Sequence, residues 1–165
     1  MSNLVGVAGE HFAAGELTRR GFLVTLTRGN APGIDILAYH PETKKSVALQ
    51  VKTASGSNQS IGKWIMSQKD EDEEAVRSDA FIFIRLPELP DLPEYSIVPS
   101  QTVAKAIYDD HRRWLATPGS KGQQRSTKNT MRHFKDPAGK WRSRWGIILE
   151  LAGLSDRTAG KQETV

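Results

Sequence analysis

The sequence predicts an α/β protein in which helices flank a central mixed sheet of four to five strands. Short apolar segments of strand length recur along the chain, first as a meander and later in alternation with helical segments. This order is typical of a sheet of mixed direction that is covered by helices. The 165 residues show no break in composition, so one domain is expected over 1–155, followed by a flexible tail at 156–165.

The first half of the chain is expected to hold one helix and three strands. Residues 3–20 have helical character, and Gly21 follows them as a helix-ending glycine. The connection between the second and third strands is short and contains Pro41, so these two strands are expected to form an antiparallel hairpin. The three predicted strands are the apolar segments 22–27, 34–40 and 46–53.

The second half is expected to alternate helices with strands. A short helix is predicted over 68–77, because Ser67 is a good N-cap and acidic residues occupy the first turn. The elements predicted after it are a buried strand at 79–86, a short strand at 95–98, a helix at 100–116, an irregular segment at 119–140 and an apolar segment at 144–154.

Composition limits the classes of protein to which this chain can belong. It has no cysteine, which excludes disulfides, thiolate metal sites and a cysteine nucleophile, and is consistent with a reducing compartment. The sequence does not begin like a secretory signal, and its longest apolar run, residues 80–84, is too short to cross a bilayer. A cytoplasmic protein without membrane association is therefore expected.

The net charge of +4 is distributed unevenly. Residues 111–145 contain ten basic side chains and one acid, Asp136, and carry +9, whereas the rest of the chain carries −5. This asymmetry indicates a polyanionic partner, although a solvated face is the alternative for any run of charges. Trp141 and Trp145 lie among these cations, where they either stack on bases or belong to the core. The candidate nucleic-acid contacts are Arg125, Lys128, Arg132, Lys140, Arg142 and Arg144.

The predicted hairpin carries polar side chains that can share one side of the sheet. Asp35 lies in its first strand, and Gln50 and Lys52 are two residues apart in the second, so the latter two point the same way. Glu10 lies among apolar residues of the first helix and is expected to face inward, which is costly unless the carboxylate is paired or binds a cation. A buried structural network is the alternative. Otherwise, carboxylate and amide oxygens suit Mg²⁺ or Mn²⁺, and an ammonium beside such an ion suits phosphodiester hydrolysis.

This constellation resembles the PD-(D/E)XK nuclease superfamily, whose members have a restriction-endonuclease-like fold. The residues that carry the resemblance are Glu10, Asp35 and the triplet Gln50-Val51-Lys52, which begins fifteen residues after Asp35. The resemblance implies that Asp35, Gln50 and the Val51 carbonyl hold Mg²⁺ or Mn²⁺. It further implies that Lys52 serves the attacking water and that Glu10 assists at the metal.

Two departures from the superfamily pattern bear on activity. Ile34 precedes Asp35 where proline is usual, and Gln50 stands where an acid is usual, although a restriction-enzyme branch is similar in using Q-X-K. The neutral amide removes one negative charge, so weaker Mg²⁺ binding is expected. Residues 114–134 are also similar to uncharacterised bacterial members of the superfamily.

The function implied by the resemblance is that of a metal-dependent DNA endonuclease, a deoxyribonuclease that hydrolyses phosphodiester bonds. Two alternatives remain open at this point: a non-catalytic module that binds nucleic acid or protein with a decayed nuclease site, and a small-molecule phosphohydrolase or immunity-type interaction protein. DNA is the expected partner. A homodimer is compatible with this interpretation, because nucleases that cut both strands commonly pair two sites.

Overall fold

The computed structural model describes residues 2–27, 32–56, 62–74 and 76–155. The tail expected at 156–165 lies outside the described residues. No described helix is both long enough and apolar enough to cross a membrane. The elements in chain order are α1 (Ser2–Thr18), β1 (Leu23–Leu26), β2 (Ile36–His40), β3 (Lys45–Ser55), β4 (Lys63–Ser67), the 3-10 helix η2 (Gln68–Glu71), β5 (Ala80–Leu86), β6 (Glu94–Pro99), α2 (Ser100–Ala116), β7 (Met131–Lys135) and α3 (Gly146–Leu151).

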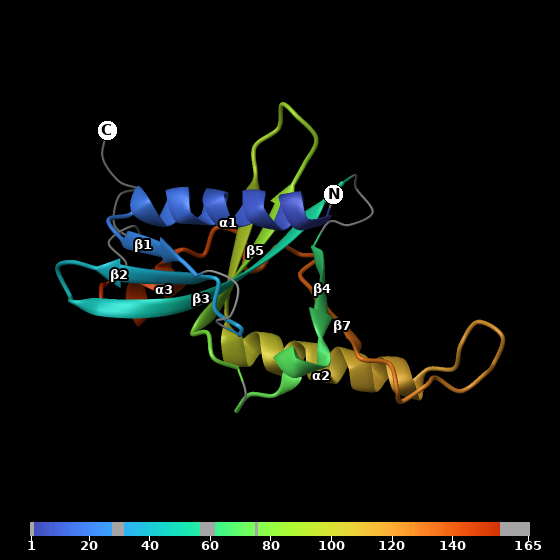
Figure 1. The fold of residues 1–165 in the computed structure, drawn as a ribbon. Coiled ribbons are helices and arrows are strands. Elements are labelled where there is room, and N and C mark those ends of the chain that lie inside the picture. The colour runs from blue at the N-terminus through green and yellow to red at the C-terminus, as the bar shows by residue number, and fades with distance from the viewer. Residues whose placement is uncertain (1, 28–31, 57–61, 75, 156–165) are drawn as a thin grey trace, which may run out of the picture.

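A five-stranded mixed sheet in the order β1-β2-β3-β5-β6 forms the centre of the fold. The first three strands form the predicted antiparallel meander, β3 and β5 run parallel, and β6 returns antiparallel to β5. Helix α1 crosses one face of this sheet, and α2 lies against the other (Figure 1). The predicted fold class, a mixed sheet of four to five strands flanked by helices, is therefore confirmed.

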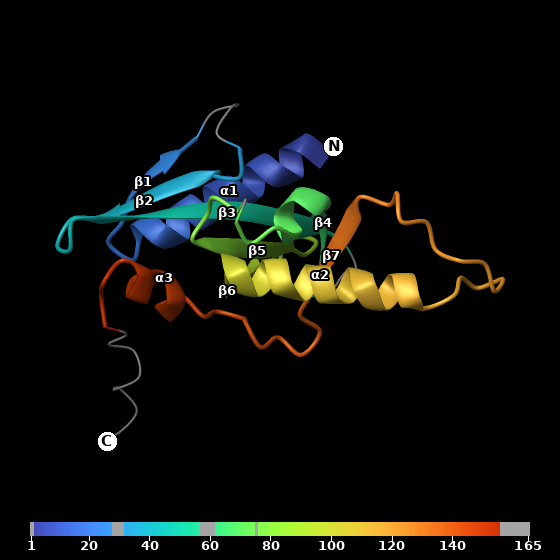
Figure 2. The ribbon, with the colours of Figure 1, turned by 90° about the horizontal axis from the view of Figure 1, so that it is seen from below.

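Each face of the sheet carries its own hydrophobic core, because successive side chains of a strand point to opposite faces. On the first face, Leu49 and Val51 of β3 pack with Leu17 of α1 and with α3. On the second face, Phe81 and Phe83 of β5 pack with α2 and with the inner sides of β4 and β7. The view from below shows α2 lying along the second face, with α3 to one side (Figure 2).

The structure differs from the sequence prediction around β4 and β7. These strands form a separate two-stranded antiparallel sheet, although no strand was expected at 63–67 and the region of 131–135 was expected to be irregular. The helix predicted over 68–77 is only the short η2, which does begin after Ser67 as its N-cap. Both new strands are five residues long, and their pairing joins distant parts of the chain, so no local pattern reveals them.

Helix α1 approaches β3 closely at Gly9. A Cβ atom at this position would overlap the side chain of Thr53, so only glycine permits this distance between helix and strand. The buried side of the helix passes through Gly9 and Leu17, whereas Val7, one turn before Glu10, is 42% exposed. Glu10 follows directly after the closest approach and is half-buried.

Candidate active site

The backbone pairing of β2 with β3 changes at Asp35, the residue before β2. Leu49 is the partner of Ile36, yet the carbonyl oxygen of Leu49 accepts a hydrogen bond from the amide of Asp35 at 2.9 Å. The hydrogen-bond donor is thus one residue before the register partner, which is the pattern of a β-bulge. A bulge redirects the side chain of the additional residue. The Asp35 Oδ2 atom accepts a hydrogen bond from the Val51 amide at 2.7 Å and so replaces the next backbone acceptor of the ladder.

The Val51 amide therefore has a side-chain acceptor where a regular ladder would supply a backbone carbonyl. We call this interruption at the edge of β3 the β3 gap. The N–H and C=O groups of one strand residue point to the same edge, so the Val51 carbonyl also points toward the β3 gap. The Val51 side chain packs in the core below α1. Asp35 and Val51 thus bring a fixed carboxylate and a carbonyl oxygen to one place.

Glu10 approaches the β3 gap from α1. Burial raises the pKa of the Glu10 carboxyl above its usual value, the nearby charge of Asp35 raises it further, and His11 opposes this shift. Glu10 therefore lies within electrostatic range of Asp35. A bound cation would stabilise such a pair, because it replaces their mutual repulsion with attraction.

Gln50 and Lys52 stand on the second face of the sheet, in register with Phe81 and Phe83 of β5. Both are half-buried, and both line a pocket of about 740 Å³ together with the residues just before Asp35. Neither Glu10 nor Asp35 belongs to the described lining of this pocket. Gln50 and Lys52 therefore stand on the α2 side of the sheet, whereas Glu10 comes from α1 on the opposite side, so the described pocket brings together only two of the four predicted site residues.

The opposite wall of this pocket comes from η2 and the residues after it, a region that the sequence analysis assigned to an ordinary helix. Asp70 closes the first turn, because its Oδ2 atom accepts hydrogen bonds from the Ser67 amide at 2.8 Å and the Ser67 hydroxyl at 3.0 Å. The serine followed three residues later by aspartate was the available sequence signal for this turn. The described residues of this wall are Ser67, Gln68, Lys69, Asp70, Glu71, Asp72, Val76 and Arg77.

The donor atoms around the β3 gap fit a hard divalent cation. Within the described ranges, no three Asp, Glu or His side chains gather closely enough to hold a metal ion by themselves. The available oxygen donors are two carboxylates and a backbone carbonyl, to which the Gln50 amide can add a fourth. All are ligand types that Mg²⁺ and Mn²⁺ accept. The set contains few charges, so it suits weak metal binding.

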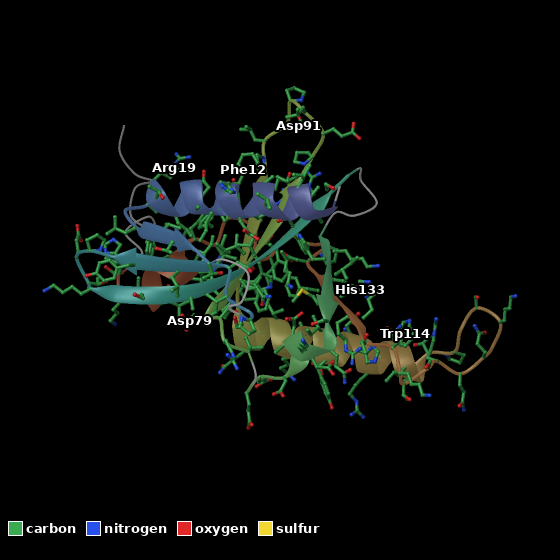
Figure 3. All side chains as sticks on the ribbon, in the orientation of Figure 1. Phe12, Arg19, Asp79, Asp91, Trp114 and His133 are labelled. Carbon is green, nitrogen blue, oxygen red and sulfur yellow. The ribbon has the colours of Figure 1, made fainter. Side chains whose placement is uncertain are left out.

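Three of the six cations predicted to contact nucleic acid lie around the C-terminal end of α2 and β7. Arg125 stacks its guanidinium on the ring of Trp114, 4.8 Å from the ring centroid, and Lys128 is exposed in the same loop. Trp114 marks the C-terminal part of α2 in Figure 3. Arg132 differs from both, because its side chain is only 4% exposed and is ion-paired with Glu71.

The other three predicted cations precede α3. Lys140 lies over the ring of Trp141 at 4.8 Å, Arg142 pairs with Glu94 at 3.2 Å, and Arg144 is exposed. Trp145 is buried in the core, which is the alternative that the sequence analysis left open for it. Of the six cations, Arg132 is therefore buried in an ion pair and Arg142 is also ion-paired.

Comparison with known proteins identifies the fold. No family model matches this sequence, and no curated protein matches it. The solved structure of a bacterial homing endonuclease, I-Ssp6803I, is similar with a TM-score of 0.56 and 14% identity, over 93% of this chain and 94% of that one. Hjc, a Holliday junction resolvase from Archaeoglobus fulgidus, has a TM-score of 0.48 and 15% identity, over 90% of this chain and 96% of that one. At this identity the likeness to the homing endonuclease shows the fold alone: the chain has a restriction-endonuclease-like fold.

Proposed function

We propose that this protein hydrolyses phosphodiester bonds of DNA with the help of a divalent metal ion. The observation that carries the proposal is the β3 gap, where the Asp35 carboxylate takes the place of a backbone acceptor at Val51. A sheet gains nothing in stability from such an interruption, whereas functional sites commonly use bulges to aim side chains. The restriction-endonuclease-like fold, which is shared with a homing endonuclease, supports the same class of reaction.

The metal ion would be held mainly by the carboxylates of Asp35 and Glu10, with the Val51 carbonyl and the Gln50 amide as further oxygen donors. A bound Mg²⁺ or Mn²⁺ supplies a positive charge for the phosphoryl oxygens and lowers the pKa of a water molecule. The hydrogen bond from the Val51 amide holds the Asp35 carboxylate in one orientation, so less freedom is lost when an ion binds.

Lys52 would act on the phosphate and on the attacking water from the other side of the β3 gap. Its ammonium group lines the same pocket as Gln50, and the volume of about 740 Å³ is sufficient for a nucleotide. An ammonium group in this position orients the water and offsets the negative charge that builds up in the transition state. The cations of the segment 112–144 that remain accessible would hold the DNA backbone.

The second candidate function is a binding module that has the fold of a nuclease but no catalysis. Two observations favour it: Gln50 is neutral, and no three acidic or histidine side chains gather in the described part of the chain. Both reduce the expected affinity for a metal ion. The module would bind nucleic acid or protein, and it differs from the first candidate in that no bond is broken.

A plasmid-nicking assay with increasing Mg²⁺ or Mn²⁺ tests the proposed hydrolysis. The wild-type protein should convert supercoiled to nicked plasmid, and the variants Asp35→Ala and Lys52→Ala should each slow it by about 100-fold or more, because each removes a group that stabilises the transition state. Lys45→Ala is the matched control, since Lys45 is an exposed lysine at the other end of β3. A wild-type rate no higher than that of the two variants would contradict the proposal.

The variant Gln50→Glu separates an active site that binds metal weakly from a decayed site. In an active protein, the added charge should lower the metal concentration that gives half of the maximal rate. If nicking appears only in the variant, the natural protein is the binding module.

A further inference from the structure

The β4–β7 pair, here called the ribbon (Lys63–Ser67 with Met131–Lys135), has a firmly anchored inner face. The rings of Trp64 and Phe134 pack against Phe83 of the central sheet, with centroid distances of 4.9 and 4.4 Å. The Trp64 Nε1 atom also donates a hydrogen bond to a backbone carbonyl of β5 at 3.1 Å. These contacts bury the inner side chains and hold the ribbon against the sheet as a rigid support for its outward face.

The outward face of the ribbon is positively charged in a way that folding does not explain. Lys63 and Lys135 are directly opposite each other, and like charges in this position destabilise a strand pair. Lys135 is balanced by Asp110 of α2, with 2.7 Å between Nζ and Oδ1. For Lys63, the part of the chain that the structure describes offers no ion pair. The three outward cross-strand pairs are Lys63–Lys135, Ile65–His133 and Ser67–Met131.

The pKa of the His133 imidazole reflects the positive charge of this face. Burial lowers the pKa of its imidazole, and the charges of Lys63 and Lys135 lower it further, against the opposing effect of Asp110. Figure 3 shows His133 on β7. An anion placed between these side chains would relieve the repulsion between the two lysines and would favour the protonated form of His133.

Three hollows connect the candidate active site with the ribbon. The first is the pocket that contains Lys52. The second, of about 500 Å³, lies between the end of β3 and β4 and is lined by Lys52, Lys63 and His133 among others. The third, of about 650 Å³, is lined by His133 and Lys135 and by charged residues of both signs on α2, namely Asp109, Asp110, Arg112 and Arg113. Because Lys52 belongs to the first two hollows and His133 to the last two, the three hollows are neighbours, and we call this series the track.

We infer that the outward face of the ribbon is a docking surface for double-stranded DNA, and that this track guides a phosphate backbone from α2 to the candidate active site. The inference rests on the proposed function, because the track begins at Lys52. Lys52, Lys63 and Lys135 along the track offer positive charge to phosphates, and Arg112 and Arg113 add positive charge on α2, beside Asp109 and Asp110.

The shape and chemistry of the ribbon favour a duplex of DNA over other nucleic acids. A two-stranded β-ribbon fits the major groove of B-form DNA, whereas the major groove of A-form RNA is too narrow for it. Ile65 and Met131 are 69% and 50% exposed and offer apolar contacts between the cations. No Phe, Tyr or Trp is among the six outward side chains, so the ribbon lacks the rings on which the bases of a single strand would stack.

A salt titration of DNA binding tests the phosphate contact. With a labelled duplex in EDTA, which prevents hydrolysis, Lys63→Ala should weaken binding several-fold and reduce the slope of log K against log[salt] by about 0.9. Lys45→Ala removes the same charge at an exposed position outside the track and should change neither quantity. Thermal unfolding of both variants checks that they are folded.

Site-directed cross-linking tests the location of the DNA. The chain has no cysteine, so the variant Ile65→Cys gives a single attachment point for a photoreactive group. This group should cross-link to bound duplex, whereas the same group on the control Leu89→Cys should not, although Leu89 is 95% exposed in the connection between β5 and β6.

The outcomes of these experiments distinguish a failure of DNA docking on the ribbon from a failure of the proposed hydrolysis. Wild-type affinity and slope in Lys63→Ala, equal cross-linking from both cysteine positions, or tighter binding of a single strand or of RNA would each overturn the inference, even for a protein that nicks plasmid. Duplex binding through the ribbon without any nicking would support the inference and remove the proposed catalysis.

Discussion

Glu10 has a carboxylate whose charged form is disfavoured in the folded protein. Its pKa is raised by burial and by Asp35, which means that folding favours the protonated form. Stability linked to this group is therefore present at low pH and is lost as the pH rises from 4.5 through the raised pKa. At neutral pH the charged Glu10 destabilises the fold, and a metal ion at the β3 gap would reverse the sign of that contribution.

The variant Glu10→Gln should therefore unfold at a higher temperature than the wild type at pH 7 in EDTA. The difference should shrink as the pH falls toward 4.5, because the wild-type carboxylate then takes up its proton. Mn²⁺ should raise the unfolding temperature of the wild type more than that of the variant. Scanning calorimetry with Glu42→Gln, an exposed acid in the turn before β3, as control measures both effects. A variant that is less stable at pH 7 in EDTA would show that Glu10 is a structural partner.

The positions of individual side chains were predicted correctly from the sequence where a local rule applies. Alternation along a strand predicted that Gln50 and Lys52 share a face, and they line one pocket. The position of Asp35 before β2 was not predictable in this way. It depends on pairing with both neighbours, since its carbonyl accepts a hydrogen bond from Thr27 while its carboxylate accepts one from Val51. The hydrogen bonds of Asp35 thus involve three segments of the chain.

At the scale of elements, the distance between α1 and β3 decides how Glu10 reaches the β3 gap. Gly9 allows this approach, and Thr53 is the residue that a larger side chain would displace. Gly15 lies on the same helix with nothing close to its missing Cβ. The two glycines therefore differ only in what surrounds them.

The variants Gly9→Ala and Gly15→Ala should consequently change stability in opposite directions. Overpacking at Gly9 should cost about 1–3 kcal/mol, whereas Gly15→Ala should gain up to about 1 kcal/mol from helix propensity. Urea unfolding measures both. Since a shift of α1 also moves Glu10, metal-dependent nicking should fall in Gly9→Ala and persist in Gly15→Ala. An equal effect of the two substitutions on stability would mean that the contact with Thr53 relaxes without cost.

Among the helices and strands, too, the elements with local sequence signals were predicted, and those that depend on contacts between distant parts of the chain were not. The helix at 100–116 is found with these bounds, because its apolar spacing is a local signal, although its N-cap is Pro99 and no side chain caps it. The helix predicted over 68–77 is wrong beyond its first turn, and β4 and β7 were missed. Their strand conformation depends on pairing with each other and on packing against Phe83, neither of which a short window of sequence contains.

At the scale of the molecule, one buried ion pair joins the ribbon to the wall of the candidate active site. Arg132 of β7 forms two hydrogen bonds with Glu71 of η2, one of them 2.9 Å long between Nη2 and Oε1. The Arg132 side chain is 4% exposed and that of Glu71 is 16% exposed, so neither charge is well solvated. The sequence placed Arg132 among DNA contacts because charge is visible in a sequence and burial is not.

Removal of one partner should therefore be costly. Arg132→Ala should lower the free energy of unfolding by about 3–5 kcal/mol, because Glu71 is left as a partly buried charge without its partner. Lys128→Ala removes an exposed cation from the same basic segment and should leave the unfolding free energy nearly unchanged. Chemical denaturation measures both values. If Arg132→Ala keeps its stability and loses DNA affinity, this arginine is a contact residue and the ion pair is incidental.

The outward side chains of the ribbon belong to neither hydrophobic core. The core residues of the ribbon are on the opposite face of its two strands. Substitutions of the outward side chains leave the packing that supports Asp35 and Lys52 untouched. If the ribbon docks DNA as we propose, mutation on the outward face can change target preference at little cost to folding. The choice of substrate would then evolve independently of the proposed reaction.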